Sequence, residues 1–296
     1  MRKKLIFFKV ECNSKIGFGH FKRCISYSKI LIEKNVKIFF LINKNNIVKK
    51  IIKHYGIKNF FFNDLQSTSI LKKLSKKYQK HQKILIFDSY KINQKILDKP
   101  KLFFEKVGYI DDYGLNFNSD FVINYSIENN NYKYSAKKMF LGKKYLPLPK
   151  LNIKTKKIIK IKTILLTFGA MDHYDLTRKI FLWFSRNQYK KKFIIIIGPF
   201  YKDKEKLKKF FSKFKNTKIY TSPLNILNIL KKSDLIVCAG GITVYESLFF
   251  NKLVLSIQLW KNQNNTGRNL YSNNLQILKY SINKFYFLNM FKKALI

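Results

Sequence analysis

Short apolar runs alternate with lysine-rich stretches along nearly the whole chain of 296 residues. Each run has the length of a buried strand, whereas the stretches between most of them repeat apolar residues at helical spacing. This alternation is typical of parallel sheets flanked by helices and predicts an α/β fold. The predicted strands are residues 5–10, 36–42, 59–62, 84–88, 107–111, 121–124, 163–168, 193–198, 218–220, 235–238 and 253–257.

Two prolines interrupt the alternation near the middle of the chain. Pro147 and Pro149 are one residue apart, and neither a helix nor a central strand can continue through such a pair. We therefore predict two doubly wound, Rossmann-like domains, residues 1–148 and 149–296. Ligands of such sheets bind outside the carboxyl ends of the strands, so two facing domains would enclose a cleft. Residues 282–296 are apolar and aromatic and predict a final helix.

The charge of the chain is strongly positive, with 60 Lys and Arg against 16 Asp and Glu and a formal net charge of +44. Such an excess favours nucleic acid or an anionic membrane as a partner. However, nearly all of the charge is lysine spread along the chain, and lysine lacks the planar fork of arginine. We interpret it as a solvated basic surface that attracts a small anion and expect no specific nucleic-acid partner. Polyanion binding that falls steeply with salt is an alternative.

The cysteines and the hydropathy indicate the compartment. Cys12, Cys24 and Cys238 are odd in number and have no metal-type spacing, which predicts reduced thiols in the cytoplasm. Residues 5–8 are too short for the core of a signal peptide, and no run approaches the ~18 apolar residues of a membrane span. We expect a cytoplasmic monomer without a membrane span.

The loop between the first predicted strand and a helix at residues 20–33 contains Gly17, Gly19 and His20. Glycines let a ligand approach the backbone, and the N–H groups at a helix start attract anions. The positive end of the helix also favours the neutral imidazole of His20, which can then act as a general base. The loop alone leaves two interpretations open, a catalytic site and a glycine turn against which the histidine packs.

A similar loop follows the strand at 235–238 in the second half. Gly240, Gly241 and Thr243 open a helix and offer N–H groups and a hydroxyl to a diphosphate. Glu246 lies three residues after Thr243, which favours a capping box between the two; ribose binding by Glu246 is the other interpretation.

Polar residues follow several other strands. Gly169 marks a turn that would lie beside a ligand, and Asn262 and Gln263 offer amides to phosphate or sugar hydroxyls or belong to a plain loop. Asp111 and Asp112 are adjacent, so their side chains point in opposite directions and favour a structural turn over a shared catalytic role.

Together these residues resemble the family of UDP-sugar hydrolases of pseudaminic acid biosynthesis, which release UDP from UDP-2,4-diacetamido-2,4,6-trideoxy-β-L-altropyranose. Residues 16–23 match the I-G-x-G-H-x-x-R pattern of that family, and order and spacing agree over nearly the whole chain. The further matches are Asp88 with Tyr90, the Asp111–Asp112 pair, residues 240–246, and Asn262 with Gln263. The resemblance implies the glycosyltransferase-B fold and a cytoplasmic role in making a precursor of surface glycans.

The resemblance also implies roles for single residues. His20 would activate water to attack the anomeric carbon with inversion, Gly240, Gly241 and Thr243 would hold the diphosphate, and Glu246 would hold the ribose. UDP is a good leaving group once its charge is stabilised, so we expect no metal and no cofactor. The further residues assigned to substrate are Gly17, Gly19, Arg23, Tyr90, Asn262 and Gln263, and Gly169 is assigned to the nucleotide.

The chain departs from the family pattern at three places. Glu11 replaces an aspartate, Ser89 replaces a histidine, and residues 168–170 replace a double glycine. These positions would line the cleft, so a related nucleotide-activated deoxysugar is an alternative substrate. A glycosyltransferase of the same fold, which hands the sugar to an acceptor instead of water, is the alternative enzyme class.

Overall fold

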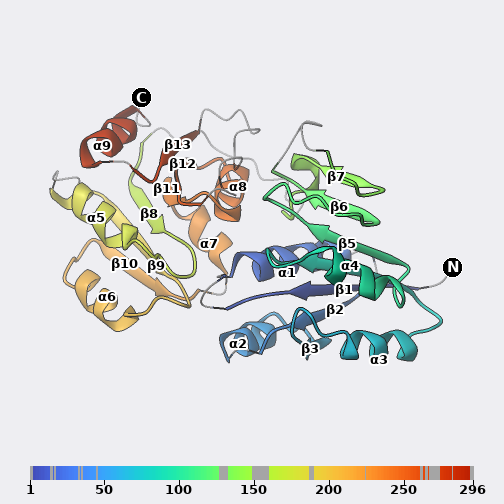
Figure 1. Cartoon of the computed structure of the whole chain (residues 1–296). Coiled ribbons are helices and arrows are strands. Elements are labelled where there is room, and N and C mark those ends of the chain that lie inside the picture. The colour runs from blue at the N-terminus through green and yellow to red at the C-terminus, as the bar shows by residue number, and fades with distance from the viewer. Residues whose placement is uncertain are drawn as a thin grey trace. The chain divides into compact units, whose positions relative to one another are not determined.

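The computed structural model describes residues 3–13, 16, 18–32, 34, 36–44, 46–126, 133–148, 160–186, 190–223, 225–260, 263, 266, 274–281 and 283–293. The chain divides into two compact units, Met1–Lys150 and Leu151–Ile296. Each unit contains a parallel sheet with helices connecting its strands (Figure 1).

The sheet of the first unit has the strand order β3-β2-β1-β4-β5-β6-β7, and neighbouring strands are parallel. This is the doubly wound order, in which the direction of winding reverses between β1 and β4. Its elements are β1 (Lys4–Val10), α1 (Gly19–Ile32), β2 (Lys37–Ile42), α2 (Asn46–His54), β3 (Phe60–Phe62), α3 (Ser69–Lys77), β4 (Gln82–Asp88), α4 (Gln94–Lys101), β5 (Lys106–Ile110), β6 (Phe121–Asn124), β7 (Met139–Leu141) and a short 3₁₀ helix (Lys143–Tyr145).

Alternate residues of β1 pack against helices on opposite faces of this sheet. Phe7 stacks on Phe39 at a centroid distance of 4.6 Å, in the core that includes residues of α3 and α4. Phe8 stacks on Phe40, which in turn meets Phe21 of α1 edge-to-face. These aromatic contacts fix the start of α1 next to the end of β1, where the glycine–histidine loop lies.

The second unit repeats this winding with the strand order β10-β9-β8-β11-β12-β13, again parallel throughout. Helices α5, α6 and α9 contribute to the core on one face, and α7 and α8 to the core on the other. Its elements are β8 (Thr163–Thr167), α5 (Leu176–Arg186), β9 (Lys192–Ile197), α6 (Lys204–Phe211), β10 (Thr217–Thr221), α7 (Ile226–Lys231), β11 (Leu235–Ala239), α8 (Ile242–Phe249), β12 (Leu253–Gln258), β13 (Leu275–Lys279) and α9 (Lys284–Lys293).

The predicted α/β class with parallel sheets is confirmed, and every predicted strand is present to within two residues at each end. The sequence did not predict β7 and β13. Both pair with one neighbour at the edge of a sheet and are mostly half-exposed, so they lack the continuous apolar run of a central strand. Among the residues described above, no helix has the length and apolar character needed to cross a bilayer.

Candidate functional site

His20 and Asp88 meet at the point where the first sheet reverses its winding. His20 is the second residue of α1, Asp88 is the last residue of β4, and Asp88 lies beside Val10 in the register of the two strands. The imidazole Nδ1 of His20 hydrogen-bonds to Oδ1 of Asp88. Doubly wound sheets bind their ligands at this position, outside the carboxyl ends of the strands.

The contacts of Asp88 fix the tautomer of His20. Nδ1 of His20 and Nη2 of Arg23 both lie against Oδ1 of Asp88, and they are 3.1 Å from each other. A carboxylate oxygen only accepts, so Nδ1 carries the proton and Nε2 presents a lone pair. Nε2 is buried and has no hydrogen-bond partner among the described residues. An acceptor held in this way suits a general base.

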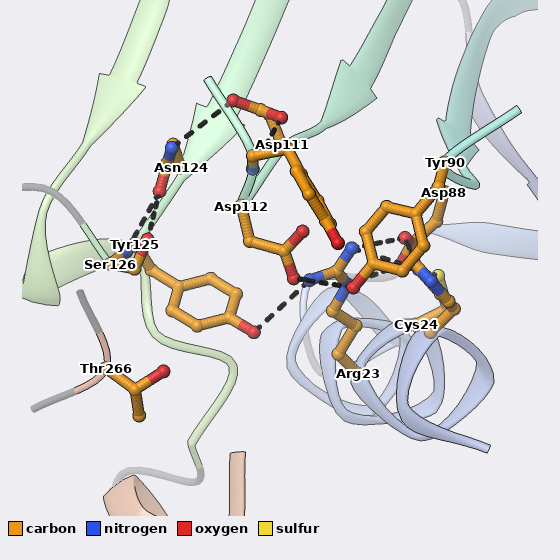
Figure 2. A network of polar contacts seen from close by, with 12 residues as sticks. Arg23, Cys24, Asp88, Tyr90, Asp111, Asp112, Asn124, Tyr125, Ser126 and Thr266 are labelled. Atoms are coloured by element: carbon orange, nitrogen blue, oxygen red, sulfur yellow. Dashed lines mark hydrogen bonds and ion pairs between the residues drawn. The ribbon is translucent and has the colours of Figure 1, made fainter. Parts of the chain in front are cut away.

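Arg23 forms ion pairs with two carboxylates, those of Asp88 and Asp112 (Figure 2). Its Nε donates to Oδ2 of Asp88 at 2.6 Å, and its Nη1 donates to Oδ2 of Asp112 at 2.8 Å and to the Tyr125 hydroxyl at 3.5 Å. Burial works to lower the pKa of Arg23, but Asp88 and Asp112 raise it well above its usual value. The guanidinium is therefore a permanent charge whose donors point at protein side chains.

Asp88 has no exposed surface, yet it remains ionised. Burial alone would raise the pKa of its carboxyl group, but Arg23 and His20 lower it to about 2. A carboxylate that stays charged next to Nδ1 orients the imidazole and would stabilise an imidazolium if Nε2 took a proton.

Asp112 and Tyr90 complete the surroundings of the histidine ring. The Tyr90 ring meets the His20 ring edge-on at a centroid distance of 4.3 Å, and its hydroxyl donates to Oδ2 of Asp112 at 3.2 Å. The other oxygen of Asp112, Oδ1, is buried without a hydrogen-bond partner in the described part of the chain. Leaving an acceptor in that state costs about 1–3 kcal/mol, more for a charged group, so a functional explanation is needed.

The two adjacent aspartates have different roles. Asp111 accepts hydrogen bonds from the backbone N–H groups of Tyr113 and Gly114 at 3.0 and 2.8 Å and from the Tyr134 hydroxyl at 2.5 Å. The predicted structural turn is therefore confirmed for Asp111. For Asp112 it is wrong, because that side chain points the other way and pairs with Arg23 (Figure 2).

Glu11 and Ser89 contact each other. The Ser89 hydroxyl donates to Oε2 of Glu11, and Nζ of Lys91 lies 3.5 Å from Oε1 of Glu11. Glu11 follows β1 and Ser89 follows β4, so both lie at the same edge of the sheet as His20. Glu11 is therefore held at this edge by Ser89 and Lys91.

The loop after β8 in the second unit has a backbone that only glycine adopts easily. Gly169 has φ of +79°, in the left-handed region. Asp172, three residues later, accepts hydrogen bonds from the backbone N–H groups of Leu176 and Thr177, both at 2.9 Å. Both carboxylate oxygens of Asp172 thus cap the start of α5, which is a structural role.

The predicted capping box at the start of α8 is wrong. The helix begins at Ile242 with Gly241 as its N-cap, and glycine has no side chain with which to cap it. Thr243 is already the second helical residue, and its hydroxyl is therefore displaced from the N-cap position. A Cβ on Gly241 would meet nothing within 4 Å, so the backbone there is open to a ligand. Glu246 is buried on the same helix.

Gln263 and Thr266 pack on this glycine loop. Oε1 of Gln263 accepts from the backbone N–H of Leu259 at 2.8 Å, and a Cβ on Gly240 would lie 2.9 Å from Cβ of Gln263. The Thr266 hydroxyl donates to the carbonyl of Gly240 at 2.9 Å. The carbonyl end of Gln263 is therefore engaged by Leu259 after β12, and the stem of its side chain packs against Gly240. Gly17 and Asn262 lie outside the described residues.

Sequence reasoning underrated Asp88 and missed the role of Asp112. Their signal was present, because each acid stands at the carboxyl end of a predicted strand, but their partners are 65 and 89 residues away in the sequence. Among the described side chains, no group of three or more His, Cys, Asp or Glu is arranged to hold a metal ion.

Comparison with known sequences gives one distant relative and no family. No family model matches the chain. The uncharacterized protein MJ1062 of Methanocaldococcus jannaschii is 27% identical over 282 residues, which cover 88% of this chain and 56% of that protein. The chain thus spans about half the length of the curated relative that it matches.

Comparison with solved structures identifies the fold. MurG of Acinetobacter baumannii matches with a TM-score of 0.61 at 13% identity, covering 99% of this chain and 91% of that one. A glycosyltransferase from Rickettsia africae matches with 0.61 at 13% identity, covering 99% and 88%. UDP-GlcNAc 2-epimerase from Neisseria meningitidis, bound to UDP-GlcNAc, matches with 0.58 at 13% identity, covering 98% and 90%. Together with the two doubly wound sheets, these similarities show that the chain has the two-domain glycosyltransferase-B fold.

Proposed function

We propose that this chain is an enzyme that processes a UDP-activated sugar, and specifically that it hydrolyses a UDP-diacetamido-trideoxyhexose to UDP and the free sugar. The general proposal is supported by the structural neighbours, one of which is bound to UDP-GlcNAc. The specific proposal is supported by the family resemblance of residues 16–23 and by the chemistry of the site. The product would be a cytoplasmic precursor of a nonulosonic acid of the pseudaminic type.

The observation that carries the proposal is the buried His20–Asp88 pair, in which Nε2 of His20 has no hydrogen-bond partner among the described residues. In the proposed reaction the oxygen of water attacks the anomeric carbon while Nε2 takes one proton of the water. The bond from that carbon to the UDP oxygen breaks, and its electron pair leaves with UDP. General-base catalysis of this kind contributes about 10²- to 10⁴-fold in rate.

In the first unit we propose that Gly19 and Tyr90 bind the sugar. Gly19 precedes His20 in the sequence, and the Tyr90 ring contacts the His20 ring. A Cβ on Gly19 would meet nothing within 4 Å, which is compatible with close approach of a ligand. Arg23 we assign to positioning, because its donors are directed at Asp88, Asp112 and Tyr125. Contacts from Gly17, Asn262 and Gln263 to the sugar remain part of the proposal.

In the second unit we assign UDP to the edge where β8 and β11 end. The sheet reverses its winding there, and the N-terminus of α8 supplies N–H groups and a positive dipole for the diphosphate. Gly240, Gly241 and Thr243 belong to this loop, and Gly169 follows β8 on the adjacent strand. Glu246 is proposed to accept hydrogen bonds from the ribose.

The experiment incubates the protein with the UDP-diacetamido-trideoxyaltrose in water enriched in ¹⁸O, with no sugar acceptor, and follows products by NMR and mass spectrometry. We expect UDP release, with the label in the anomeric hydroxyl of the sugar and none in UDP. Label in UDP would place the cleavage at phosphorus and contradict the proposal. Release of UDP only after an acceptor is added would indicate a glycosyltransferase, the class named for the Rickettsia africae neighbour.

A further inference from the structure

Two buried acceptor atoms without partners belong to the same side-chain cluster. They are Nε2 of His20 and Oδ1 of Asp112, and neither has a hydrogen bond to a described residue. His20 is 4% exposed, and the Asp112 side chain is 15% exposed. Buried polar atoms are nearly always satisfied, and the exceptions in native proteins commonly serve catalysis or hold a water molecule.

Two separate sets of contacts place Asp112 next to His20. The first runs through Arg23, whose Nη2 lies 3.1 Å from Nδ1 of His20 and whose Nη1 lies 2.8 Å from Oδ2 of Asp112. The second runs through Tyr90, whose ring meets the His20 ring edge-on. The Tyr90 hydroxyl donates to the same Oδ2 (Figure 2). Both sets use Oδ2 and leave Oδ1 as the oxygen available to a ligand.

We propose that Asp112 is a second catalytic residue, which orients the attacking water together with His20. Water has two O–H groups, and the cluster offers two unpartnered acceptors. One O–H donates to Nε2 of His20 and the other to Oδ1 of Asp112, which directs a lone pair of the water oxygen at the anomeric carbon. This inference rests on the proposed hydrolysis.

The proton balance assigns different tasks to the two acceptors. When the carbon–oxygen bond forms, the hydrogen bonded to Nε2 moves to His20, and the electron pair of the breaking bond leaves with UDP. The hydrogen bonded to Asp112 stays on the oxygen and becomes part of the anomeric hydroxyl of the product. Asp112 therefore accepts a hydrogen bond throughout and takes no proton.

The test exploits the difference between water and methanol. Methanol has one O–H group, and it must donate to His20 for the proton to be removed. Methanol therefore has no second O–H group to donate to Asp112. In Asp112→Asn the amide oxygen is expected to occupy the position of Oδ2, because Arg23 and the Tyr90 hydroxyl both donate hydrogen bonds there and require an acceptor. The amide nitrogen then replaces Oδ1 and cannot accept from water.

We expect Asp112→Asn to lower kcat for hydrolysis by roughly ten- to a hundredfold with little change in KM, as for the loss of a hydrogen bond to a charged group. In a fixed water–methanol mixture the ratio of methyl glycoside to free sugar should rise by roughly the same factor. The matched control is Asp98→Asn, the same chemical change at a surface ion pair with Lys101 on α4, and it should leave both quantities unchanged.

Three results with the variant would overturn the inference: hydrolysis at the wild-type rate, hydrolysis and methanolysis reduced by the same factor, or a change confined to KM. If the variant does not fold, the wild-type protein alone provides the test. The inference requires the wild type to favour water over methanol by more than their molar ratio. Products formed in proportion to the two concentrations would contradict the inference. Absence of UDP release from the wild type would instead refute the proposed function itself, and the inference with it.

Discussion

At the scale of single residues, the site depends on Asp88, whose partners His20 and Arg23 lie far from it in the sequence. The strand–loop–helix pattern drew attention to His20 with two interpretations left open, and Asp88 was recognised as an acid at a strand end and through the family resemblance. Their contact follows from the adjacency of β1 and β4, which brings together residues 68 positions apart. The direction of the Asp112 side chain depends in the same way on long-range contacts with Arg23 and Tyr90.

Replacing the orienting carboxylate should impair catalysis more than folding. In Asp88→Asn the amide no longer selects the Nδ1–H tautomer of His20 or stabilises its imidazolium, so we expect kcat to fall by about 10²- to 10⁴-fold. The free energy of unfolding should fall by about 1.5–3 kcal/mol, because Arg23 loses a charged partner. Steady-state kinetics and urea unfolding measure the two effects. A kcat within about threefold of wild type would show that Asp88 does not orient the base.

The depressed pKa of Asp88 predicts a defined acid sensitivity. Its pKa is about 2 in the folded chain against an ordinary value of 3.8, so its stabilising effect is fully present above pH about 4 and is lost as the pH falls through about 2. The shift corresponds to roughly 2 kcal/mol. The difference in unfolding free energy between wild type and Asp88→Asn should therefore shrink between those two pH values. A difference that stays constant over this range would contradict the assignment of the shift to Asp88.

At the scale of elements, the glycine loops were predictable and their details were not. Sequence placed glycines where β1 meets α1 and where β11 meets α8, and both loops are found there. The capping box failed because α8 begins one residue before Thr243 with glycine as its cap, a boundary set by the backbone rather than by side-chain pattern. The edge strands β7 and β13 were not predicted for a related reason. They are defined by hydrogen-bonded pairing with one neighbouring strand and not by a buried apolar run.

Two glycine substitutions distinguish a position where the backbone requires glycine from one where it does not. Gly169→Ala should lower the free energy of unfolding by about 1–2 kcal/mol, because alanine is strained at φ of +79°. Gly19→Ala should leave stability unchanged or raise it by up to about 1 kcal/mol, because Gly19 is helical and a Cβ there meets nothing within 4 Å. Equal destabilisation of both variants in urea unfolding would contradict this distinction.

At the scale of the whole molecule, the α/β alternation was sufficient to predict two doubly wound sheets, and the structural neighbours confirm the fold. Each unit has its own aromatic-rich core. We interpret the formal charge of +44 as a general field that attracts an anionic substrate rather than as a specific binding site.

This interpretation predicts how activity responds to salt. Raising the ionic strength from about 20 to about 300 mM should increase KM for the UDP-sugar by roughly three- to tenfold and leave kcat nearly unchanged, because salt screens attraction over distance. The control compares two inhibitors, since inhibition by UDP should weaken with salt while inhibition by uncharged uridine should not. The same salt response for both inhibitors would refute the electrostatic explanation.

The central claim is that Nε2 of His20 is the base that activates water, and His20→Asn tests it most directly. The amide nitrogen of asparagine takes the place of Nδ1 and can still donate to Asp88, so the variant should fold normally while it has no atom at the position of Nε2. The measurement is the initial rate of UDP release at saturating substrate, compared with wild type. We predict a fall in kcat of about 10²- to 10⁴-fold with little change in KM. A variant that retains a kcat within about twofold of wild type would contradict the account, because a lost general base lowers the rate far more than that.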